Sequence, residues 1–349
     1  MKTSFVSTAS VSQSLRSQLM RMQSELVSAN KESQTLTVAD RGLALGARTT
    51  QSVSLSRDME RINGIIDQNG LISSRLTATQ NALAQIEEKA QAFLSTLTAG
   101  LAGDATEAVT LVDAKGTLDT LTSIMNTTFK GEHIFSGINT DVKPLNDYIG
   151  PGSPAKAAFD ASFQTFFGFT QSDPAAANIT AAQMTTFMDS VVAPQFLGAG
   201  WEANWSEASN QTITSRISLN ETVNTSVNAN GDGMRKLAMA ATAIYEMLSS
   251  PTMSSAAKTA ATEKAYTLVS EAIGDITTTR SGIGIVEERV TKATARLQTQ
   301  ADLFELTIGK MEGVDPYEAS TRVTTLLEQI ETSYALTARL QNLSLTKFL

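Results

Sequence analysis

Residues 62–97 read INGIIDQNGLISSRLTATQNALAQIEEKAQAFLSTL. Along this stretch, steps of three and four residues alternate without a slip and connect what we call the seam residues: Ile62, Ile65, Asn69, Ile72, Leu76, Thr79, Leu83, Ile86, Ala90, Phe93 and Leu97. Such spacing places one narrow, mainly apolar stripe along a helix, as in coiled-coil packing. We therefore predict one long helix that ends at Gly100 and Gly103 and packs against helical partners.

Similar spacing predicts further helices. One stripe runs from Leu111 to Thr128, with Gly131 as its end, and another runs from Ile283 to Ile308, closed by Gly309 and Gly313. Residues 234–248 and 262–276 also have a helical pattern, and Pro251 separates them. A narrow apolar stripe on each helix requires helical partners, so these distant segments are expected to pack as one antiparallel rod.

Both ends of the chain carry a thin apolar stripe among polar residues. Isolated helices of this kind are marginal in water, so we expect both to become ordered only against partners. The residues predicted to make subunit contacts are Leu15, Leu19, Met22, Leu26, Val323, Leu327, Ile330, Tyr334, Leu340 and Leu343, with Leu336 also on the stripe.

Residues 144–228 differ in composition from the rest. They hold both tryptophans, a run of phenylalanines between Phe159 and Phe169, and two basic against seven acidic residues. Alternation over residues 212–218 and, more weakly, 221–228 predicts strands, and residues 230–233 (NGDG) predict a turn. A small domain needs a core, so the phenylalanines are expected to form one.

These patterns predict a mainly α fold: an elongated antiparallel helical rod with paired terminal helices and a small inserted α+β domain. The expected divisions are residues 1–38 and 315–349 for the terminal helices, 39–143 and 229–314 for the rod, and 144–228 for the insertion. This nested plan places both termini at one end of the rod.

Composition excludes several classes of function. The 349-residue chain has no cysteine, one histidine, and a net charge of −8 without a basic cluster, so neither nucleic acid nor a thiolate metal site is expected. No apolar run is long enough to span a membrane, and Met1 to Ser12 is too polar for a signal peptide. We expect no cofactor, no metal and no enzymatic activity.

Isolated polar features support the same view. His133 lacks other ligands or a catalytic partner, so a turn or packing role is expected. The acidic residues Asp58, Glu60, Glu87, Glu88, Glu287 and Glu288 fall on predicted polar helix faces, where solvated charge is normal. Gly282 and Gly284 lack the strand and third glycine of a dinucleotide motif and are expected to begin or bend a helix.

Several passages resemble the flagellin superfamily. Residues 131–144 (GEHIFSGINTDVKP) are similar to the G-x-x-Φ-F-x-G-x-x-T-x-x-x-P passage of its hook–filament junction members, where Φ is apolar. Residues 313–319 (GVDPYEA) resemble the D-x-x-E-A start of the last helix, and residues 343–349 (LSLTKFL) resemble the junction members' tail. Residues 4–26 resemble the first helix. The likeness covers both ends and the rod, but not the insertion.

The resemblance implies an extracellular structural subunit of the bacterial flagellum that joins hook to filament and templates flagellin assembly. It implies that the chain is exported unfolded through the flagellar type III channel, without a cleaved signal peptide. It also implies that an export chaperone binds the chain beforehand, commonly at the C-terminal helix. The implied partners are further copies in a ring, the adjacent hook-associated protein and flagellin, with neither nucleic acid nor membrane.

Two other functions fit part of the sequence. Filament flagellins usually carry an S-G-x-R-I-x-x-A-x-D-D passage after the first helix, and residues 35–42 (TLTVADRG) replace it here, which argues against a filament subunit. A cytosolic coiled-coil scaffold accounts for the heptads, but not for the nested insertion or the passage from Gly131 to Gly137. An enzyme is disfavoured because no polar constellation converges.

Overall fold

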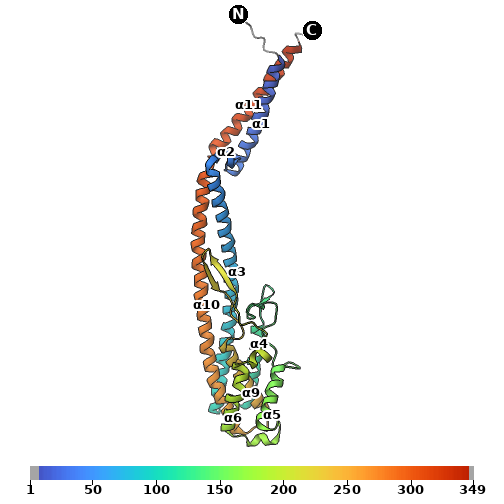
Figure 1. Ribbon diagram of the computed structural model, residues 1–349, viewed down its shortest axis with the longest axis vertical. Coiled ribbons are helices and arrows are strands. Elements are labelled where there is room, and N and C mark those ends of the chain that lie inside the picture. Colours follow the sequence, from blue (N-terminus) through green and yellow to red (C-terminus); the bar gives the residue numbers. More distant parts are fainter. Residues whose placement is uncertain (1–7, 346–349) are drawn as a thin grey trace. The chain divides into compact units, whose positions relative to one another are not determined.

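The computed structural model describes the backbone of residues 8–345 and the side chains of residues 10–339. Contacts divide the chain into two compact units. We call residues 1–64 with 296–349 the terminal unit, and residues 65–295 the central unit. Both are dominated by helices, as predicted (Figure 1). The long helices α3 (Thr49–Ala102) and α10 (Ser255–Glu312) contribute residues to both units.

The terminal unit contains the two ends of the chain as paired helices. Helix α1 (Thr8–Thr35) packs against α11 (Pro316–Leu345). Between α1 and α3, the short helix α2 (Arg41–Leu45) is capped by Asp40, whose carboxylate accepts a hydrogen bond from the Leu43 amide at 3.0 Å, and a 3-10 turn, η1 (Gly46–Arg48), follows. The predicted pairing of the terminal segments is thus confirmed.

In the central unit, α3 and α10 run antiparallel. The Asn69 amide donates to the Thr294 hydroxyl at 3.0 Å, and Gln80 donates to the Arg280 carbonyl at 2.7 Å, so rising numbers on one helix meet falling numbers on the other. All seam residues from Ile62 to Leu97 are buried. The predicted stripe is confirmed, although α3 begins at Thr49, well before Ile62.

Helix α10 is continuous across all its glycines. Gly282, Gly284 and Gly309 lie within the helix, which ends at Glu312. The prediction that Gly282 and Gly284 begin or bend a helix, and that Gly309 closes one, was therefore wrong. A helical glycine costs only about 1 kcal/mol relative to alanine. Buried residues on the same helix, such as Ile283 and Val290, offset that cost.

Helices α4 (Glu107–Met125) and α9 (Asp232–Ser249) pack against each other beside α3 and α10. Helix α4 buries Leu118, Leu121 and Met125, as its stripe predicted. Thr128 was placed on the same helix, but it lies in strand β1 (Thr128–Phe129) because α4 ends at Met125, with Asn126 as its C-cap.

The passage that resembles the junction members forms a hairpin followed by a tight crossing. Strand β1 pairs with β2 (Glu132–His133) across a turn at Lys130 and Gly131, both with positive φ. Ile134 and Phe135 are buried. At Gly137, φ is 66°, and a Cβ would lie 2.3 Å from the Ser209 carbonyl oxygen, so only glycine fits.

Most of the regular secondary structure between β2 and α9 is helical. This segment contains α5 (Pro154–Phe167), η2 (Pro174–Asn178), α6 (Ala181–Phe187), the π-helical turn η3 (Met188–Val192), α7 (Ala193–Leu197) and α8 (Gly200–Asn204). Phe159 and Phe163 are fully buried against Phe187, so the predicted aromatic core is present, while Phe166 is 39% exposed.

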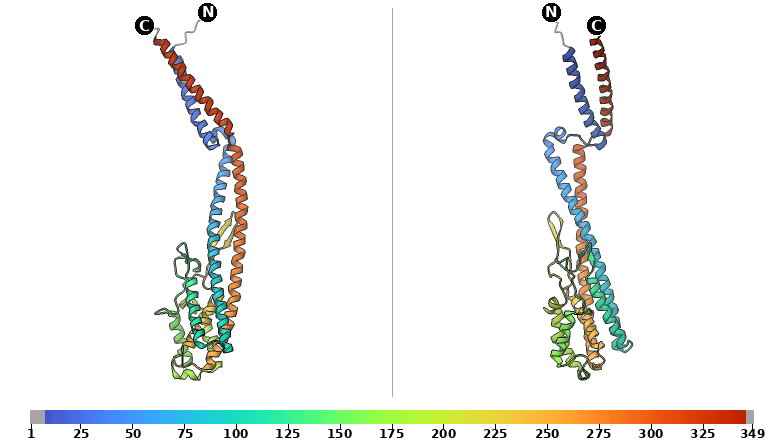
Figure 2. Two further views of the ribbon diagram at one scale, coloured as in Figure 1. Left: turned by 180° about the vertical axis from the view of Figure 1, so that it is seen from behind. Right: turned by 90° about the vertical axis from the view of Figure 1, so that its right-hand side faces the viewer.

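A hairpin of β3 (Thr214–Ser218) and β4 (Glu221–Asn224) closes this segment. It is the strand pair predicted there, although both strands are shorter than predicted. Figure 2 shows the hairpin beside α3 and α10 in both views. The Asn69 amide donates to the Ile217 carbonyl at 2.9 Å, and Arg289 pairs with Glu221 at 3.0 Å. The polar seam residue Asn69 thus fixes the hairpin as well as the helix pair.

One hydrophobic core joins the inserted segment to the helices of the central unit. It includes Leu83 of α3, Leu118 of α4, Phe163 of α5 and Val269 of α10. The division at residues 144 and 228 therefore remains a proposal that rests on composition, since the two sides of it share this core.

Candidate assembly surface

The contact between α1 and α11 is thin and lies entirely in the terminal unit. From α1 it buries Met22 and Ala29, and from α11 it buries Ala319, Leu326 and Ile330. The Gln23 side-chain amide donates to the Tyr334 hydroxyl at 3.0 Å, and Arg322 pairs with Glu32 at 3.0 Å. The later residue of α1 thus meets the earlier residue of α11, so the helices are antiparallel. A seam of so few buried side chains leaves most of each helix surface uncovered.

The ten residues predicted to make subunit contacts divide between three environments. Met22 and Ile330 are buried in the seam, while Leu15, Leu19, Leu26 and Val323 are half-buried along it. Leu327 and Tyr334 are 46% and 52% exposed. Leu340 and Leu343 belong to α11, but their side chains lie outside the described residues. An assembly role for all ten remains a prediction.

The structure shows which residues of the predicted α11 stripe face α1 and which are exposed to solvent. The α1-facing row contains Ala319, Val323, Leu326 and Ile330, so Leu326 takes the inward place that the stripe gave to Leu327. Both residues are leucine, and steps of three and four suit either choice. Only the position of the partner helix decides which of them is buried.

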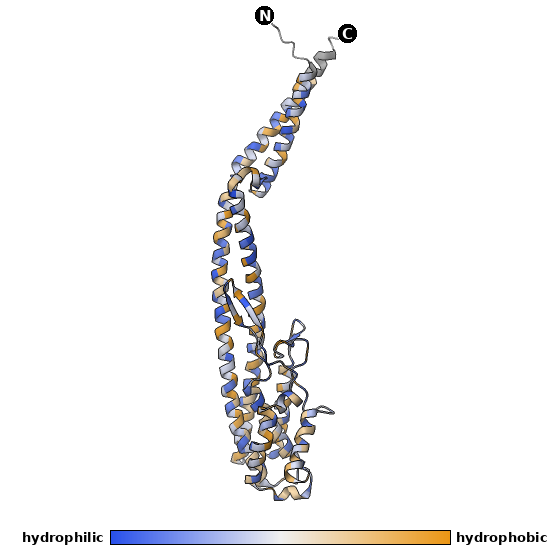
Figure 3. Cartoon of the chain, in the orientation of Figure 1, coloured by the Kyte–Doolittle hydropathy of each residue, from blue (hydrophilic) through white to orange (hydrophobic). Residues whose placement is uncertain are grey.

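Other exposed apolar residues were missed. Met20 and Val27 are 63% and 71% exposed on α1, and Tyr317 is 84% exposed on α11. Figure 3 shows apolar and polar residues interspersed along these helices. The seven-residue spacing of Met20 and Val27, off the main stripe, was the available signal, because it places both on one side of a helix.

Exposed apolar residues are concentrated in the terminal unit. Among the described residues, ten of the twenty exposed large apolar side chains belong to it, although it holds about a third of the chain. On α10 of this unit, Leu303 and Leu306 are 59% and 55% exposed. A high density of uncovered apolar side chains marks a surface for protein contact.

The connections beside α1 and α11 are held by polar contacts. Thr37 forms an antiparallel bridge with Gly313, and the Val38 amide donates to the Glu312 carbonyl at 2.8 Å. The Glu312 side chain is buried, where it accepts from the Ser52 hydroxyl and pairs with Arg41 at 2.9 Å. Leu36 adopts a φ of 55°, which turns the chain out of α1.

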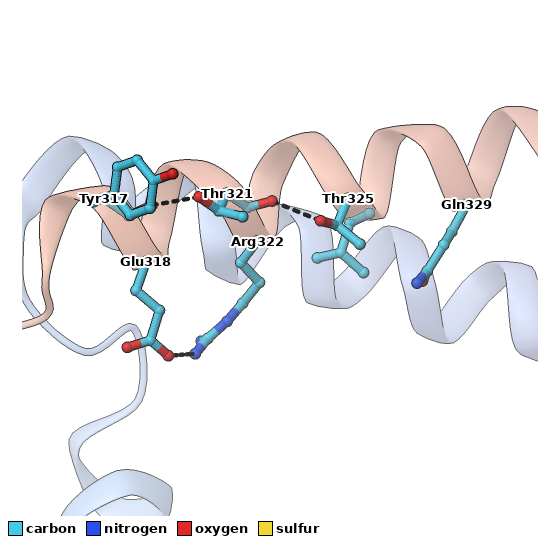
Figure 4. Close-up of a pocket in the computed structure, with 7 residues that line it drawn as sticks. Tyr317, Glu318, Thr321, Arg322, Thr325 and Gln329 are labelled. Carbon is cyan, nitrogen blue, oxygen red and sulfur yellow. Dashed lines mark hydrogen bonds and ion pairs between the residues drawn. The ribbon is translucent and has the colours of Figure 1, made fainter.

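A shallow groove of about 500 Å³ runs along one side of α11 and reaches the seam residue Leu326 (Figure 4). Its base is a row at every fourth position: Tyr317, Thr321, Thr325 and Gln329. Glu318 and Arg322, paired at 3.0 Å, line one side with Leu326. The hydroxyl of Thr321 donates to the Tyr317 carbonyl at 2.8 Å, and that of Thr325 donates to the Thr321 carbonyl at 2.9 Å.

The central unit has a buried polar cluster, which serves packing. The Tyr148 hydroxyl donates to Glu246 at 2.9 Å, and Lys156 pairs with the same carboxylate oxygen at 2.8 Å. Burial and then the Glu246 charge raise the pKa of Tyr148. Desolvation lowers the pKa of Lys156, but the hydrogen bonds and charges of Glu246 and Asp160 together raise the pKa overall.

The remaining polar candidates also have structural surroundings. The Nδ1 atom of His133 lies 3.0 Å from the Asn126 carbonyl oxygen, within the turn after α4. Glu87 pairs with Arg280 between α3 and α10. Among the described residues, no three His, Cys, Asp or Glu gather closely enough to hold a metal ion. Within residues 8–345, no helix has the length and apolar character needed to cross a membrane.

Two family models match the chain. The bacterial flagellin N-terminal helical region matches residues 6–140, and the bacterial flagellin C-terminal helical region matches residues 266–349. Together they cover more than half of the sequence, including both terminal helices, the long helix α3 and most of α10. The chain belongs to the flagellin family. It is therefore a structural protein of the flagellum.

A solved structure has the same fold as this flagellin-family chain. It is described as a putative flagellar hook-associated protein from Vibrio parahaemolyticus, with a TM-score of 0.52 and 11% sequence identity. The match covers 76% of this chain and 97% of that one. The comparison with curated proteins finds no match.

Proposed function

We propose that this flagellin-family chain joins the flagellar hook to the filament and templates the assembly of flagellin. The observation that carries the assembly role is the terminal helix pair, whose seam is thin and whose outward faces hold uncovered apolar residues such as Val27 and Leu327. Side chains of this size gain roughly 1.5–3 kcal/mol each on full burial, so a few contacts per copy hold a lattice of many neighbours together.

Sequence supports the junction over the filament. Residues 131–137 resemble the junction members' passage, and three of its fixed positions have a structural reason: Ile134 and Phe135 are buried, and only glycine fits at Gly137. Residues 35–42 lack the filament passage; here Leu36, Thr37 and Asp40 have defined roles as turn, bridge and helix cap.

The partners proposed for this role are copies of the same chain, the adjacent hook-associated protein and flagellin. Unfolded export with a chaperone at α11 is part of the same proposal. A thin seam suits export because little packing is lost when α1 and α11 separate. Limited proteolysis of the soluble monomer tests this: early cleavage within α1 and α11 is expected, and intact termini would argue against it.

A filament subunit is the second candidate, because the matching family models are the terminal regions of flagellin itself. Immunogold labelling of intact flagella, with an antibody against residues 144–228, separates the candidates. The junction role requires label in a narrow band where hook meets filament. Label along the whole filament would identify a filament subunit. Signal confined to the cytosol would favour a coiled-coil scaffold instead.

A further inference from the structure

We propose that Tyr148 is a redox-active residue, which gives an electron to the oxidised tryptophans stacked on it and releases its hydroxyl proton to Glu246. The oxidant is an external one-electron oxidant, such as an oxygen-derived radical or a photo-oxidised metal complex. All the residues involved lie in the central unit, so this chemistry goes beyond the assembly role and does not depend on it.

Tyr148 forms one end of a stack of three aromatic rings. The rings of Tyr148 and Trp205 are nearly parallel, with an interplanar angle of 9° and centroids 5.1 Å apart. Trp205 in turn stacks on Trp201 at 8° and 5.4 Å. The three side chains are no more than 2% exposed. Electron transfer weakens steeply with distance, so stacked neighbours in a dry core exchange an electron far more readily than separated rings do.

The hydrogen-bond partners decide which ring keeps the oxidation. An aromatic side chain that loses an electron becomes a strong acid at its O–H or N–H group, and the product is stabilised when that proton leaves. The Nε1–H of Trp201 donates to the Asn230 side-chain oxygen at 2.9 Å, and a neutral amide holds a proton poorly. The Tyr148 hydroxyl donates to the Glu246 carboxylate at 2.9 Å, which accepts a proton readily. Oxidised Trp201 therefore remains a buried cation, whereas Tyr148 becomes a neutral radical.

The surroundings of Glu246 suit this proton transfer. Burial and then the Glu246 charge raise the pKa of Tyr148, so the hydroxyl still carries its proton when oxidation begins. One electron then passes from Tyr148 through Trp205 to the oxidant, and one proton passes from the Tyr148 oxygen to Glu246. Lys156 pairs with Glu246 at 2.8 Å and with Asp160 at 3.4 Å, so it keeps one carboxylate partner after Glu246 becomes neutral.

The absence of native cysteine allows an oxidant to be placed beside the stack. Ala203 is exposed and lies two positions from each tryptophan, so Ala203→Cys in the purified full-length chain carries a ruthenium polypyridyl label. Light excites the label, and a cobalt(III) ammine complex then removes one electron from it irreversibly. The oxidised label draws an electron from the stack. Electron paramagnetic resonance of samples frozen after the flash should show a neutral tyrosyl radical in place of a tryptophan radical.

Three variants of this labelled chain locate the radical. Tyr148→Phe should abolish the tyrosyl signal and leave a tryptophan radical, because phenylalanine is much harder to oxidise. Tyr245→Phe is the matched control, since that ring lies 6.4 Å from Tyr148 at its edge, and the tyrosyl signal should remain. Trp205→Phe interrupts the stack and should lower the tyrosyl yield several-fold. Circular dichroism of each chain serves as the folding control.

A solvent exchange tests the proton transfer without any change to the buried rings. In heavy water the labelled chain should form the tyrosyl radical more slowly, because the hydroxyl hydrogen moves with the electron. A role in packing alone predicts no such effect. A tyrosyl signal that survives Tyr148→Phe, or a tryptophan radical that persists in the labelled chain, would overturn the proposal. Equal yields with and without Trp205, or equal rates in the two solvents, would also overturn it.

Discussion

Glu32 of α1 and Arg322 of α11, 290 positions apart in sequence, form an ion pair at 3.0 Å in the terminal unit. The Glu32 carboxylate also accepts a hydrogen bond from the Ala39 amide at 3.1 Å, just after α1 has ended. One side chain thus sets both the register of the two terminal helices and the path of the chain that leaves them.

Substitution of Glu32 should separate these two contributions. Glu32→Gln keeps an acceptor for Ala39 and loses the ion pair, which should cost at most about 1 kcal/mol, since the Arg322 side chain is 48% exposed and also pairs with Glu318. Glu32→Ala removes both and should cost about 1 kcal/mol more. Hydrogen exchange of the α1 and Ala39 amides measures each loss. Equal exchange in the two variants would show that the Ala39 bond contributes nothing.

The stability of the connection that contains the buried Glu312 carboxylate should depend on its ion pair with Arg41. Arg41→Ala removes the ion pair from that buried carboxylate and leaves its hydrogen bond from the Ser52 hydroxyl, which should cost roughly 1–3 kcal/mol. Arg41→Lys restores the charge and serves as the control. Hydrogen exchange over residues 36–52 reports the change. Unaltered protection in Arg41→Ala would show that the pair is not needed.

Gly137 and Gly131 form a matched pair of positive-φ glycines in one passage. A Cβ at Gly131 meets nothing within 4 Å, so Gly131→Ala should cost only the left-handed backbone penalty, roughly 1–2 kcal/mol. A Cβ at Gly137 would lie 2.3 and 2.5 Å from two carbonyl oxygens, so Gly137→Ala should cost clearly more. Thermal unfolding compares the two variants. Similar melting temperatures would contradict the close approach of the Ser209 and Gln211 carbonyl groups to Gly137.

Alkaline pH should destabilise the central unit through Tyr148. Its pKa is raised by burial and by Glu246, so the folded state keeps the proton that the unfolded state releases above about pH 10. The stabilisation is complete below that pH and falls by about 1.4 kcal/mol for each unit above it. Urea unfolding from pH 8 to 11, followed by the fluorescence of Trp201 and Trp205, measures this, since Tyr148 stacks on Trp205 with ring centroids 5.1 Å apart.

Tyr148→Phe is the control for that slope. The variant cannot ionise at this position, so its stability should fall less steeply above pH 10 than that of the unaltered chain. The Lys156–Glu246 pair remains in both and contributes equally. Parallel slopes would assign the alkaline loss to other groups.

Two neighbouring positions on α11 should separate folding from assembly. Ile330→Ala removes a side chain buried against α1 and should destabilise the terminal unit by about 2–4 kcal/mol. Leu327→Ala removes one that is 46% exposed and should change its stability by no more than about 0.5 kcal/mol. Leu327→Ala should nevertheless reduce the amount of chain in isolated flagella. Unchanged incorporation would exclude Leu327 from the assembly surface.

The helices and their long-range pairing could be predicted from the order of the residues alone. The seam from Ile62 to Leu97 was identifiable because apolar side chains repeat at helical spacing in few structures besides a packed helix. Composition located the aromatic core around Phe163, and Pro251 located the break between the two helical segments that flank it. A local pattern predicts the folded structure when the preferences of neighbouring residues agree with the tertiary packing.

Which face of each terminal helix is covered could not be predicted in this way. Leu326 and Leu327 are chemically identical, and the position of α1 makes one inward and the other outward. The continuity of α10 through Gly282 and Gly309 likewise depends on packing that offsets the poor helix propensity of glycine. Residue order thus decides which segments become helices, because helical periodicity is local. Their surfaces for other molecules depend on tertiary contacts, which the chain makes only once it has folded.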